Sequence, residues 1–281
     1  MVIKTGIIPE VAFEIFGIPI YWYAILMVSG MLIALLLCRV YNGKFNIKFE
    51  DILDLAVWVL PISIICARLY YVIFSWEYYS NNLQDIYKIK DGGLAIYGGL
   101  IGGVLTIIVY CKIKKKNPLD ITDYVVPTVA LAQAIGRWGN YINIEAYGYE
   151  TNFPLKMEVI EAGITKYVHP TFLYESICTL AIFIILSIIS KKRKFSGEIT
   201  YLYIILYAIA RFFIEGLRTD SLMLLNVRIS QILSLVLFII FTGILIYKLN
   251  KQKQMSKNVE KARWKVYKNA HNHAFFVDCV Y

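Results

Sequence analysis

The chain has 281 residues, of which 58% are hydrophobic and only 17% are charged, and its mean hydropathy is +0.58. A soluble globular protein carries about a quarter charged residues, so this composition excludes an ordinary soluble domain and indicates a polytopic membrane protein. The formal net charge of +9 does not indicate nucleic-acid binding. The basic residues stand in short clusters between apolar runs, as orientation in a membrane requires.

Seven apolar runs each approach the roughly 20 residues that a helix needs to cross a hydrocarbon core. They lie near 20–41, 52–75, 93–112, 119–138, 170–190, 198–215 and 229–248. We therefore predict an all-α integral membrane protein with about seven transmembrane helices. The first run is too long for a cleavable signal peptide and has no basic leading segment.

Basic residues alternate between the connections. The loops 42–51, 112–117 and 191–197 and the segment after Tyr247 carry most of them, and that last segment holds eight Lys and Arg. The positive-inside rule then places the N-terminus outside and the C-terminus in the cytoplasm. We expect residues 1–249 to form one transmembrane domain, with the 139–169 connection as an outer cap. Residues 250–281 are polar and basic without a clear apolar period, which predicts a mobile cytoplasmic tail.

The cysteines and histidines do not form a recognisable site. Four cysteines lie within or at the ends of apolar runs, and Cys279 lies in the tail. There is no CxxC pair, and the three histidines are not at metal-ligand spacing, so we expect neither disulfides nor a metal.

Residues 131–148 read LAQAIGRWGNYINIEAYG. An arginine near the end of an apolar span is usually an anchor that reaches the interface. Arg137, however, stands between two glycines and precedes Asn140, Glu145 and Gly148. Glycines allow backbone or ligand to approach closely, and the amide and carboxylate groups can orient a head group. This stretch favours a polar site within the membrane over a simple anchor.

Several polar groups are expected at one depth. Spans two, four and six run outward with an arginine late in each, whereas spans one, three and five run inward with polar groups early in each. These groups are Arg68, Arg137, Arg211, Tyr23, Tyr97, Tyr174 and Glu175. Independent anchors would be spread over both leaflets, so the shared depth predicts one cavity open to the outer side. Asp54 and Asp123, in contrast, stand in first helical turns at the cytoplasmic edge, where a structural role is the simpler interpretation.

The sixth span repeats polar residues every four positions. Tyr207, Arg211 and Glu215 therefore share one helix face. The pattern is compatible with an ion pair that only lets a charged span insert. The other two arginines have fewer obvious carboxylate partners, and unpaired positive charge suits an anionic ligand such as a phospholipid head group.

Two further segments can each be interpreted as structural or as part of the site. The glycine-rich start of span three contains Gly98/Gly102 and Gly99/Gly103 pairs, which favour close helix packing, but glycines beside Tyr97 also suit a loop near a ligand. His169 precedes Pro170 at the start of span five, where a histidine is more often structural than functional.

Together these residues resemble the prolipoprotein diacylglyceryl transferase family. The resemblance extends in order from about residue 15 to residue 245, and the tail beyond Asn250 lies outside it. It rests on Gly92 to Gly99 (GGLAIYGG), Gly136 to Asn143 (GRWGNYIN) with Glu145 and Gly148, His169-Pro170, Tyr174-Glu175, Trp22-Tyr23, Arg68, and Tyr207, Arg211 and Glu215.

The resemblance implies a bacterial inner-membrane enzyme. It would move the sn-1,2-diacylglyceryl group of phosphatidylglycerol to the lipobox cysteine thiol of a prolipoprotein signal peptide, leaving a thioether and sn-glycerol 1-phosphate. No cofactor, metal or nucleic acid is implied. The expected catalytic residues are Arg137, Arg211, Tyr97, Glu215 and Tyr207. The expected contacts to phosphatidylglycerol are Arg137, Asn140, Glu145, Tyr23, Arg68, Gly98, Gly148, His169, Tyr174 and Glu175.

One residue departs from the family pattern. Many members have a histidine, proposed as general base, where this chain has Tyr97. A tyrosine with a reference pKa near 10 is a poor base at neutral pH. Tyr97 therefore either positions substrate only, or the thiol is deprotonated with help from the arginines or another acceptor.

Two other classes of function would account for part of this pattern. A transporter of an anionic lipid or metabolite would also use intramembrane arginines, but it predicts polar groups continuing to the cytoplasmic face or two related halves, and the sequence has neither. A non-catalytic scaffold gives no reason for three arginines to share a depth.

Overall fold

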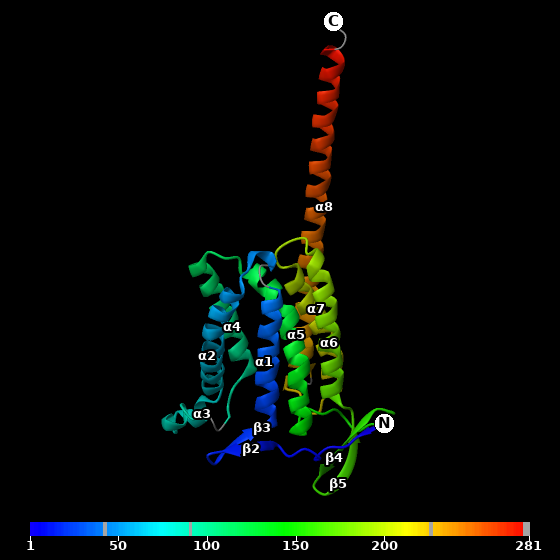
Figure 1. The fold of residues 1–281 in the computed structure, drawn as a ribbon. Coiled ribbons are helices and arrows are strands. Elements are labelled where there is room, and N and C mark those ends of the chain that lie inside the picture. Colours follow the sequence, from blue (N-terminus) through cyan, green and yellow to red (C-terminus); the bar gives the residue numbers. More distant parts are fainter. Residues whose placement is uncertain (42–43, 90–91, 225–226, 278–281) are drawn as a thin grey trace.

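The computed structural model describes residues 1–41, 44–89, 92–224 and 227–277, with backbone alone at 44, 224, 262 and 265–277. The chain is mainly helical (Figure 1). The long helices are α1 (Trp22–Val40), α2 (Phe49–Phe74), α4 (Ile96–Lys114), α5 (Pro118–Ile142), α6 (Thr171–Ile189), α7 (Glu198–Glu215) and α8 (Ile229–Val277). A short helix α3 (Trp76–Tyr79) and the 3-10 turns η1 (Lys44–Asn46), η2 (Leu83–Asp85) and η4 (Ser190–Lys192) lie between them.

Five helical segments are long and apolar enough to cross a membrane. Within the described residues they are Trp22–Val40, Phe49–Phe74, Ile96–Lys114, Thr171–Lys192 and Ile229–Lys261. Helices α5 and α7 are more polar, because α5 contains Asp123 and Arg137 and α7 contains Arg211 and Glu215. The helices make the chain a multi-pass membrane protein, while seven crossings remain a prediction.

Three helix boundaries differ from the sequence prediction. Helix α4 begins at Ile96 rather than near 93, because Gly92 and Gly93 have φ angles of +90° and +72°, which a helix does not accept. Helix α5 continues to Ile142, so the glycine–arginine motif lies on the helix itself. Helix α8 does not end near 248 but runs on and projects far beyond the bundle (Figure 1). The predicted tail is thus helical as far as Val277, and residues 278–281, including Cys279, lie outside the described residues.

Helix pairs build the bundle. Helix α2 packs mainly on α4, α1 on α5, α5 on α6, and α7 on α8. The α2–α4 contact depends on glycine: a Cβ at Gly98 would lie 2.4 Å from Tyr70 Cβ, and a Cβ at Gly102 would lie 2.6 Å from Cys66 Cβ. The packing role predicted for this glycine pair is therefore confirmed.

The all-α prediction missed three small sheets. Strands β1 (Val2–Ile3), β4 (Lys156–Glu161) and β5 (Ile164–Val168) form one sheet, in which β1 is parallel to β4 and β4–β5 is a hairpin. Hairpins β2 (Val11–Ile15)/β3 (Ile18–Tyr21) and β6 (Met223–Leu224)/β7 (Val227–Arg228) are separate. Strands β1 to β5 lie at the end of the bundle opposite the projecting part of α8 (Figure 1). We call these two ends the cap end and the tail end.

The cap is attached to the bundle by apolar packing. Met157, Val159 and Val168 of the first sheet are buried together with Phe172 in the first turn of α6. These strands are short and carry few consecutive apolar residues, so the long helical runs dominate the hydropathy of the chain. The sequence therefore predicts residues 139–169 as a connection that caps the outer face, without the strands that build the cap.

Candidate active site at the cap end of the bundle

Two arginines from different helices meet one carboxylate near the cap end. Arg137 Nη2 of α5 lies 2.6 Å from Glu175 Oε1 of α6, and Arg211 Nη1 of α7 lies 3.4 Å from the same oxygen. The Tyr207 hydroxyl donates to this oxygen as well, at 3.4 Å. The side chain of Glu175 is only 4% exposed, whereas Arg137 and Arg211 are 24% and 18% exposed. The arginines are therefore the members of the cluster that a ligand can reach.

The prediction that Arg211 and Glu215 lie on one face of α7 is confirmed. Arg211 Nη2 lies 2.5 Å from Glu215 Oε2, four residues further along the helix, and Glu215 is 2% exposed. The expectation of unpaired positive charge was wrong, because Arg211 contacts two carboxylates and Arg137 contacts one. Sequence spacing revealed the partner within one helix but not the partner supplied by α6.

Arg137 also takes part in a second series of contacts, which follows the glycine–arginine motif. Arg137 Nη1 donates to Asn140 Oδ1 at 3.3 Å, and Asn140 Nδ2 donates to Glu145 Oε1 at 2.7 Å. Tyr23 of α1 packs against the same turn, since a Cβ at Gly139 would lie 2.4 Å from its ring. The glycine, the arginine and the amide are therefore parts of one local arrangement, as the motif suggested.

Gly148 joins three segments of the chain. Its N–H donates to the His169 carbonyl at 3.0 Å, and a Cβ at this position would lie 2.8 Å from His169 Cβ and 2.9 Å from the Leu217 carbonyl oxygen. His169 Nδ1 in turn lies 3.3 Å from the Tyr174 hydroxyl. No other residue fits at Gly148 without moving the backbone of the segment after α7.

That segment, 216–220, carries its own ion pair. The Arg218 guanidinium donates to both carboxylate oxygens of Asp220, at 2.9 and 2.7 Å. Partial burial raises the pKa of the Asp220 carboxyl, but the contacts with Arg218 outweigh burial and the pKa falls below its ordinary value. The pair remains charged at neutral pH.

Arg68 has a different environment from the other two arginines. Its guanidinium donates to four backbone carbonyls, those of Asp85, Ile86, Gly92 and Gly93, at 2.6 to 3.1 Å. Within the described residues it makes no contact with the cluster around Glu175. Of the three arginines expected around one ligand, the structure brings Arg137 and Arg211 together at Glu175, and Arg68 instead organises the loop between α2 and α4. Asp91 of this loop lies outside the described residues.

Tyr97 and Gly98 lie in the first turn of α4. Gly98 is packed against α2, and Tyr97 is partly buried. Its hydroxyl has no hydrogen-bond partner in the part of the chain that the structure describes. Because no described residue pairs with this hydroxyl, a role of Tyr97 in the reaction remains a prediction.

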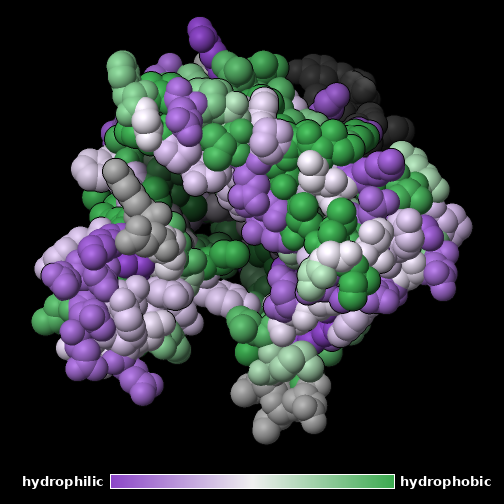
Figure 2. All heavy atoms as spheres, turned by 90° about the horizontal axis from the view of Figure 1, so that it is seen from below, coloured by the Kyte–Doolittle hydropathy of each residue, from purple (hydrophilic) through white to green (hydrophobic). Residues whose placement is uncertain are grey.

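The cap end is hollowed. Figure 2 looks at this end and shows a hollow between a lobe on the left, which α2, α3 and α4 build, and the rest of the bundle. Hydrophobic surface lies inside the hollow and hydrophilic side chains gather on both sides of it. Apolar walls with polar groups at the rim suit an amphiphilic ligand.

The tail end has a polar cluster of another kind. Asp123, fully buried, accepts from the backbone N–H groups of Gly197 and Thr200 at 2.7 and 2.8 Å, from the Thr200 hydroxyl at 2.6 Å, and from Arg193 Nη1 at 3.1 Å. This carboxylate holds the loop between α6 and α7. The structural interpretation of Asp123 is therefore supported by its partners.

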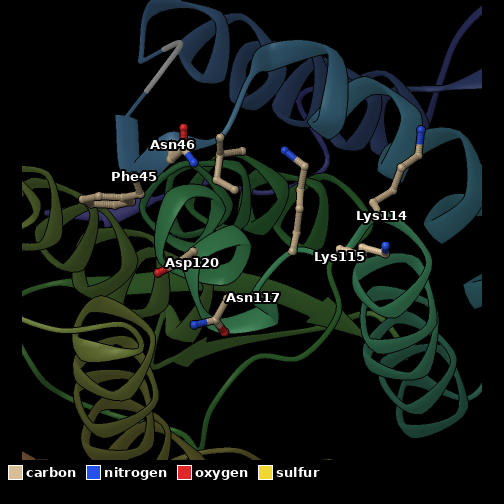
Figure 3. A pocket seen from close by; sticks show the side chains of 8 residues that line it. Phe45, Asn46, Lys114, Lys115, Asn117 and Asp120 are labelled. Carbon is tan, nitrogen blue, oxygen red and sulfur yellow. The ribbon is translucent and has the colours of Figure 1, made fainter.

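A shallow pocket lies beside this tail-end cluster. Its lining includes Asn46, Asn117, Asp120 and the lysines 114–116. In Figure 3 the labelled side chains do not converge on one point, and Lys114 and Lys116 already pair with Asp54 and Asp51 at 3.3 and 2.6 Å. Lys114 and Lys116 are thus held in ion pairs at the helix ends and are not directed into a common site.

The described part of the chain was predicted to hold no metal site. Among the described residues, no three His, Cys, Asp or Glu side chains lie together as a metal ion would require. Cys38, Cys66, Cys111 and Cys178 have free thiols. A reaction without metal or cofactor remains a prediction.

Comparison with known proteins decides the family. The family model described as Prolipoprotein diacylglyceryl transferase matches residues 10–247, which includes every residue of the cap-end cluster. This chain belongs to that family. The match ends within α8, at residue 247, so the outermost part of this helix lies beyond the matched residues.

Individual members of the family are closely similar to this chain. A protein of Clostridioides difficile (strain 630) is 50% identical over 227 residues, which cover 81% of this chain and 90% of the relative. A protein of Finegoldia magna is 49% identical over 253 residues, covering 90% and 99%, and one of Clostridium novyi is 50% identical over 249 residues, covering 85% and 95%. All three are named phosphatidylglycerol–prolipoprotein diacylglyceryl transferase.

Sequence reasoning overlooked two residues close to the family motifs. Arg228, just before α8, and Tyr149, just after Gly148, bond to each other and to the end of α7. Arg228 was only one of the basic residues in a connection, and nothing in its spacing indicated a partner almost 80 residues away.

Proposed function

We propose that this chain transfers the sn-1,2-diacylglyceryl group of phosphatidylglycerol to the lipobox cysteine of prolipoproteins, and so catalyses the first step of lipoprotein maturation. The observation that carries the proposal is the meeting of Arg137 and Arg211 at Glu175 Oε1 in a chain of this family. The relatives' names state the same lipid and protein substrates. Neither the family nor those names support the transporter alternative.

The reaction breaks the bond between a glycerol carbon and a phosphate oxygen. The substrate's cysteine sulfur forms the new carbon–sulfur bond as a thiolate, and sn-glycerol 1-phosphate leaves with the electron pair. Negative charge therefore grows on the phosphate, where positioned guanidiniums stabilise it most in a poorly hydrated site. Cationic neighbours also increase the thiolate fraction of a thiol whose ordinary pKa is about 8.5.

Glu175 has a defined task in this scheme. Before the lipid arrives, its Oε1 holds both guanidiniums at 2.6 and 3.4 Å, and Glu215 holds the other side of Arg211. Each guanidinium has five N–H donors in a planar fork, so a phosphate can bind to donors that the carboxylates leave open. Asn140 and Glu145 orient the glycerol head group.

The site belongs to the outer half of the bacterial inner membrane in this proposal. Seven helices cross the bilayer, the N-terminus and the cap lie outside, and the tail end faces the cytoplasm, where the positive-inside rule places the lysines at 112–116 and 191–194. Residues 1–249 form the catalytic domain, and the basic continuation of α8 extends from it on the cytoplasmic side. The apolar interior of the hollow suits the acyl chains of the lipid substrate.

A direct assay tests the proposal. The purified chain is placed in vesicles containing phosphatidylglycerol with a lipobox peptide, and the peptide mass and released glycerol phosphate are measured. We expect the peptide to gain one diacylglyceryl group, and Arg137→Ala and Arg211→Ala to lose about 100- to 1,000-fold in rate. There are two controls. Vesicles of phosphatidylcholine alone lack the proposed lipid substrate, and the variant Lys166→Ala changes a charged residue of the cap outside the cluster. An unchanged peptide mass with the intact chain would remove the transferase function, and lipid movement without peptide modification would favour a transporter.

A further inference from the structure

Arg228 connects three segments that the sequence keeps far apart. It lies in β7, immediately before α8, and it is partly buried. Its Nη1 donates to the Glu215 carbonyl, and its Nη2 donates to the Tyr149 hydroxyl at 2.7 Å and to the Arg218 carbonyl at 3.1 Å. The guanidinium also lies 5.5 Å from the centroid of the Tyr149 ring. The Arg228 side chain thus donates hydrogen bonds to carbonyls at and just after the C-terminal end of α7, and it also binds the turn after α5 through Tyr149.

Neighbouring contacts reinforce the same junction. Gln231 Nε2, one turn into α8, donates to the Phe212 carbonyl at 3.0 Å. The Tyr149 N–H donates to the Leu217 carbonyl at 2.9 Å. The last carbonyls of a helix have no partner within the helix, and here the side chains that open α8 supply two of those partners.

The junction includes the residues of the proposed site. Glu215, whose carbonyl Arg228 binds, pairs through its carboxylate with Arg211. Tyr149 follows Gly148, which is wedged between His169 and Leu217. A displacement of the end of α7 relative to the 145–150 turn therefore moves a phosphate-binding guanidinium relative to the head-group side of the site.

We propose that Arg228 is a positioning residue: with Tyr149 it fixes the end of α7, and hence the Arg211–Glu215 pair, against the turn that carries Gly148. It does not touch the substrate. Its planar fork is required because it must reach two backbone carbonyls and a hydroxyl at once, which a lysine cannot do.

The first experiment measures the junction without relying on the proposed function. Hydrogen–deuterium exchange is compared for Arg228→Gln, Arg193→Gln and the unchanged chain in the same lipid. We expect exchange of the 145–150 and 213–220 segments to rise about three- to tenfold in Arg228→Gln. Arg193→Gln, which removes a loop-fixing arginine from the tail end, should leave both segments unchanged. Equal protection of these segments in Arg228→Gln and the unchanged chain would overturn the proposal.

The second experiment rests on the proposed function and uses the transfer assay. Arg228→Gln should lower kcat/KM for phosphatidylglycerol by about 10- to 100-fold, in part through a higher KM for the lipid, with the KM for the peptide unchanged. A mere loss of folded protein changes neither KM. Arg228→Lys should recover only part of the activity. If the unchanged chain is inactive, the proposed function fails, and the exchange experiment still decides the role of Arg228.

A double-mutant cycle keeps the test valid if Arg228→Gln does not fold. Tyr149→Phe removes only the hydroxyl that accepts from Arg228. In the unchanged chain, Tyr149→Phe should lower kcat/KM for the lipid several-fold. In the Arg228→Lys background the same change should lower it by less than about twofold, because the effects of two interacting residues are not additive. The same factor in both backgrounds would show that Tyr149 and Arg228 act separately, and the proposal would be wrong.

Discussion

The two ends of the bundle each bury a carboxylate opposite an arginine, but the two clusters are built differently. Asp123 at the tail end accepts four hydrogen bonds between 2.6 and 3.1 Å, two of them from backbone N–H groups. Glu175 at the cap end concentrates its three side-chain donors on one oxygen, and two of those contacts are 3.4 Å long.

The neighbouring Glu215 strengthens the contrast. Its Oε2 lies 2.5 Å from Arg211 as an ion pair, but it is buried without a hydrogen bond of good geometry. A carboxylate held by backbone amides cannot change partners without unfolding a loop, whereas one held by long side chains can. Asp123 is therefore fixed by the fold of its loop, whereas Glu175 and Glu215 are held by side chains that can change partners.

The largest effect is expected at the saturated cluster. Asp123→Ala removes the acceptor of four donors and leaves Arg193 partly uncompensated, so it should lower the free energy of unfolding by about 3–5 kcal/mol. Thermal unfolding in detergent measures this, and transfer activity per folded molecule should remain near normal. A large loss of activity in fully folded protein would erase the distinction between the two ends.

The next effect tests the geometry of the cap-end cluster. Arg211→Lys keeps the charge but loses the planar fork, and we expect a rate loss of about 100-fold in the transfer assay. Arg193→Lys is the matched control at the tail end and should stay within about twofold. Near-normal turnover of Arg211→Lys would argue against bidentate contact with the phosphate.

A smaller effect sharpens the role of the shared carboxylate. Glu175→Gln keeps the size and one acceptor but removes the charge that holds both guanidiniums. We expect kcat/KM for phosphatidylglycerol to fall by about tenfold, since misplaced charges stabilise the leaving phosphate poorly. The measurement is initial rate against lipid concentration. A faster variant would mean that Glu175 competes with the phosphate rather than positioning its partners.

The smallest effect concerns Tyr97. Because its hydroxyl makes no hydrogen bond among the described residues, Tyr97→Phe should change the rate by less than about threefold, whereas removal of a general base costs about 100- to 10,000-fold. Tyr97→His introduces the residue common in the family. If the histidine variant is much faster at neutral pH and the phenylalanine variant is inactive, position 97 is the base after all.

Part of the site was predictable because it depends on local chemistry. The i, i+4 spacing brings Arg211 to Glu215 in any α-helix, and the glycine–arginine motif orders Arg137 and Asn140 on one surface of α5. Burial of charge is costly in lipid, so an arginine within an apolar span needs a polar partner, and this requirement directed attention to Arg137 and Arg211. The family resemblance rests on the same residues, and the family match agrees with it.

Other features required the packed structure. The pattern of apolar residues could not separate Arg68, which donates to loop carbonyls, from Arg137, because both are arginines late in outward spans. Nor could it find the small sheets of the cap or the length of α8, since short strands and a polar helix leave little periodic signal. The junction of Arg228, Tyr149 and Glu215 depends on segments brought together only by packing.

The sequence by itself determined that this chain is a membrane protein of helices and that Arg68, Arg137 and Arg211 each stand late in their helices, because composition and spacing act locally and the membrane restricts depth. Only the tertiary structure decided which charges from different helices meet. A guanidinium finds its partner through the direction of its donors and the packing of the helix that carries it, and neither quantity is encoded in spacing along the chain.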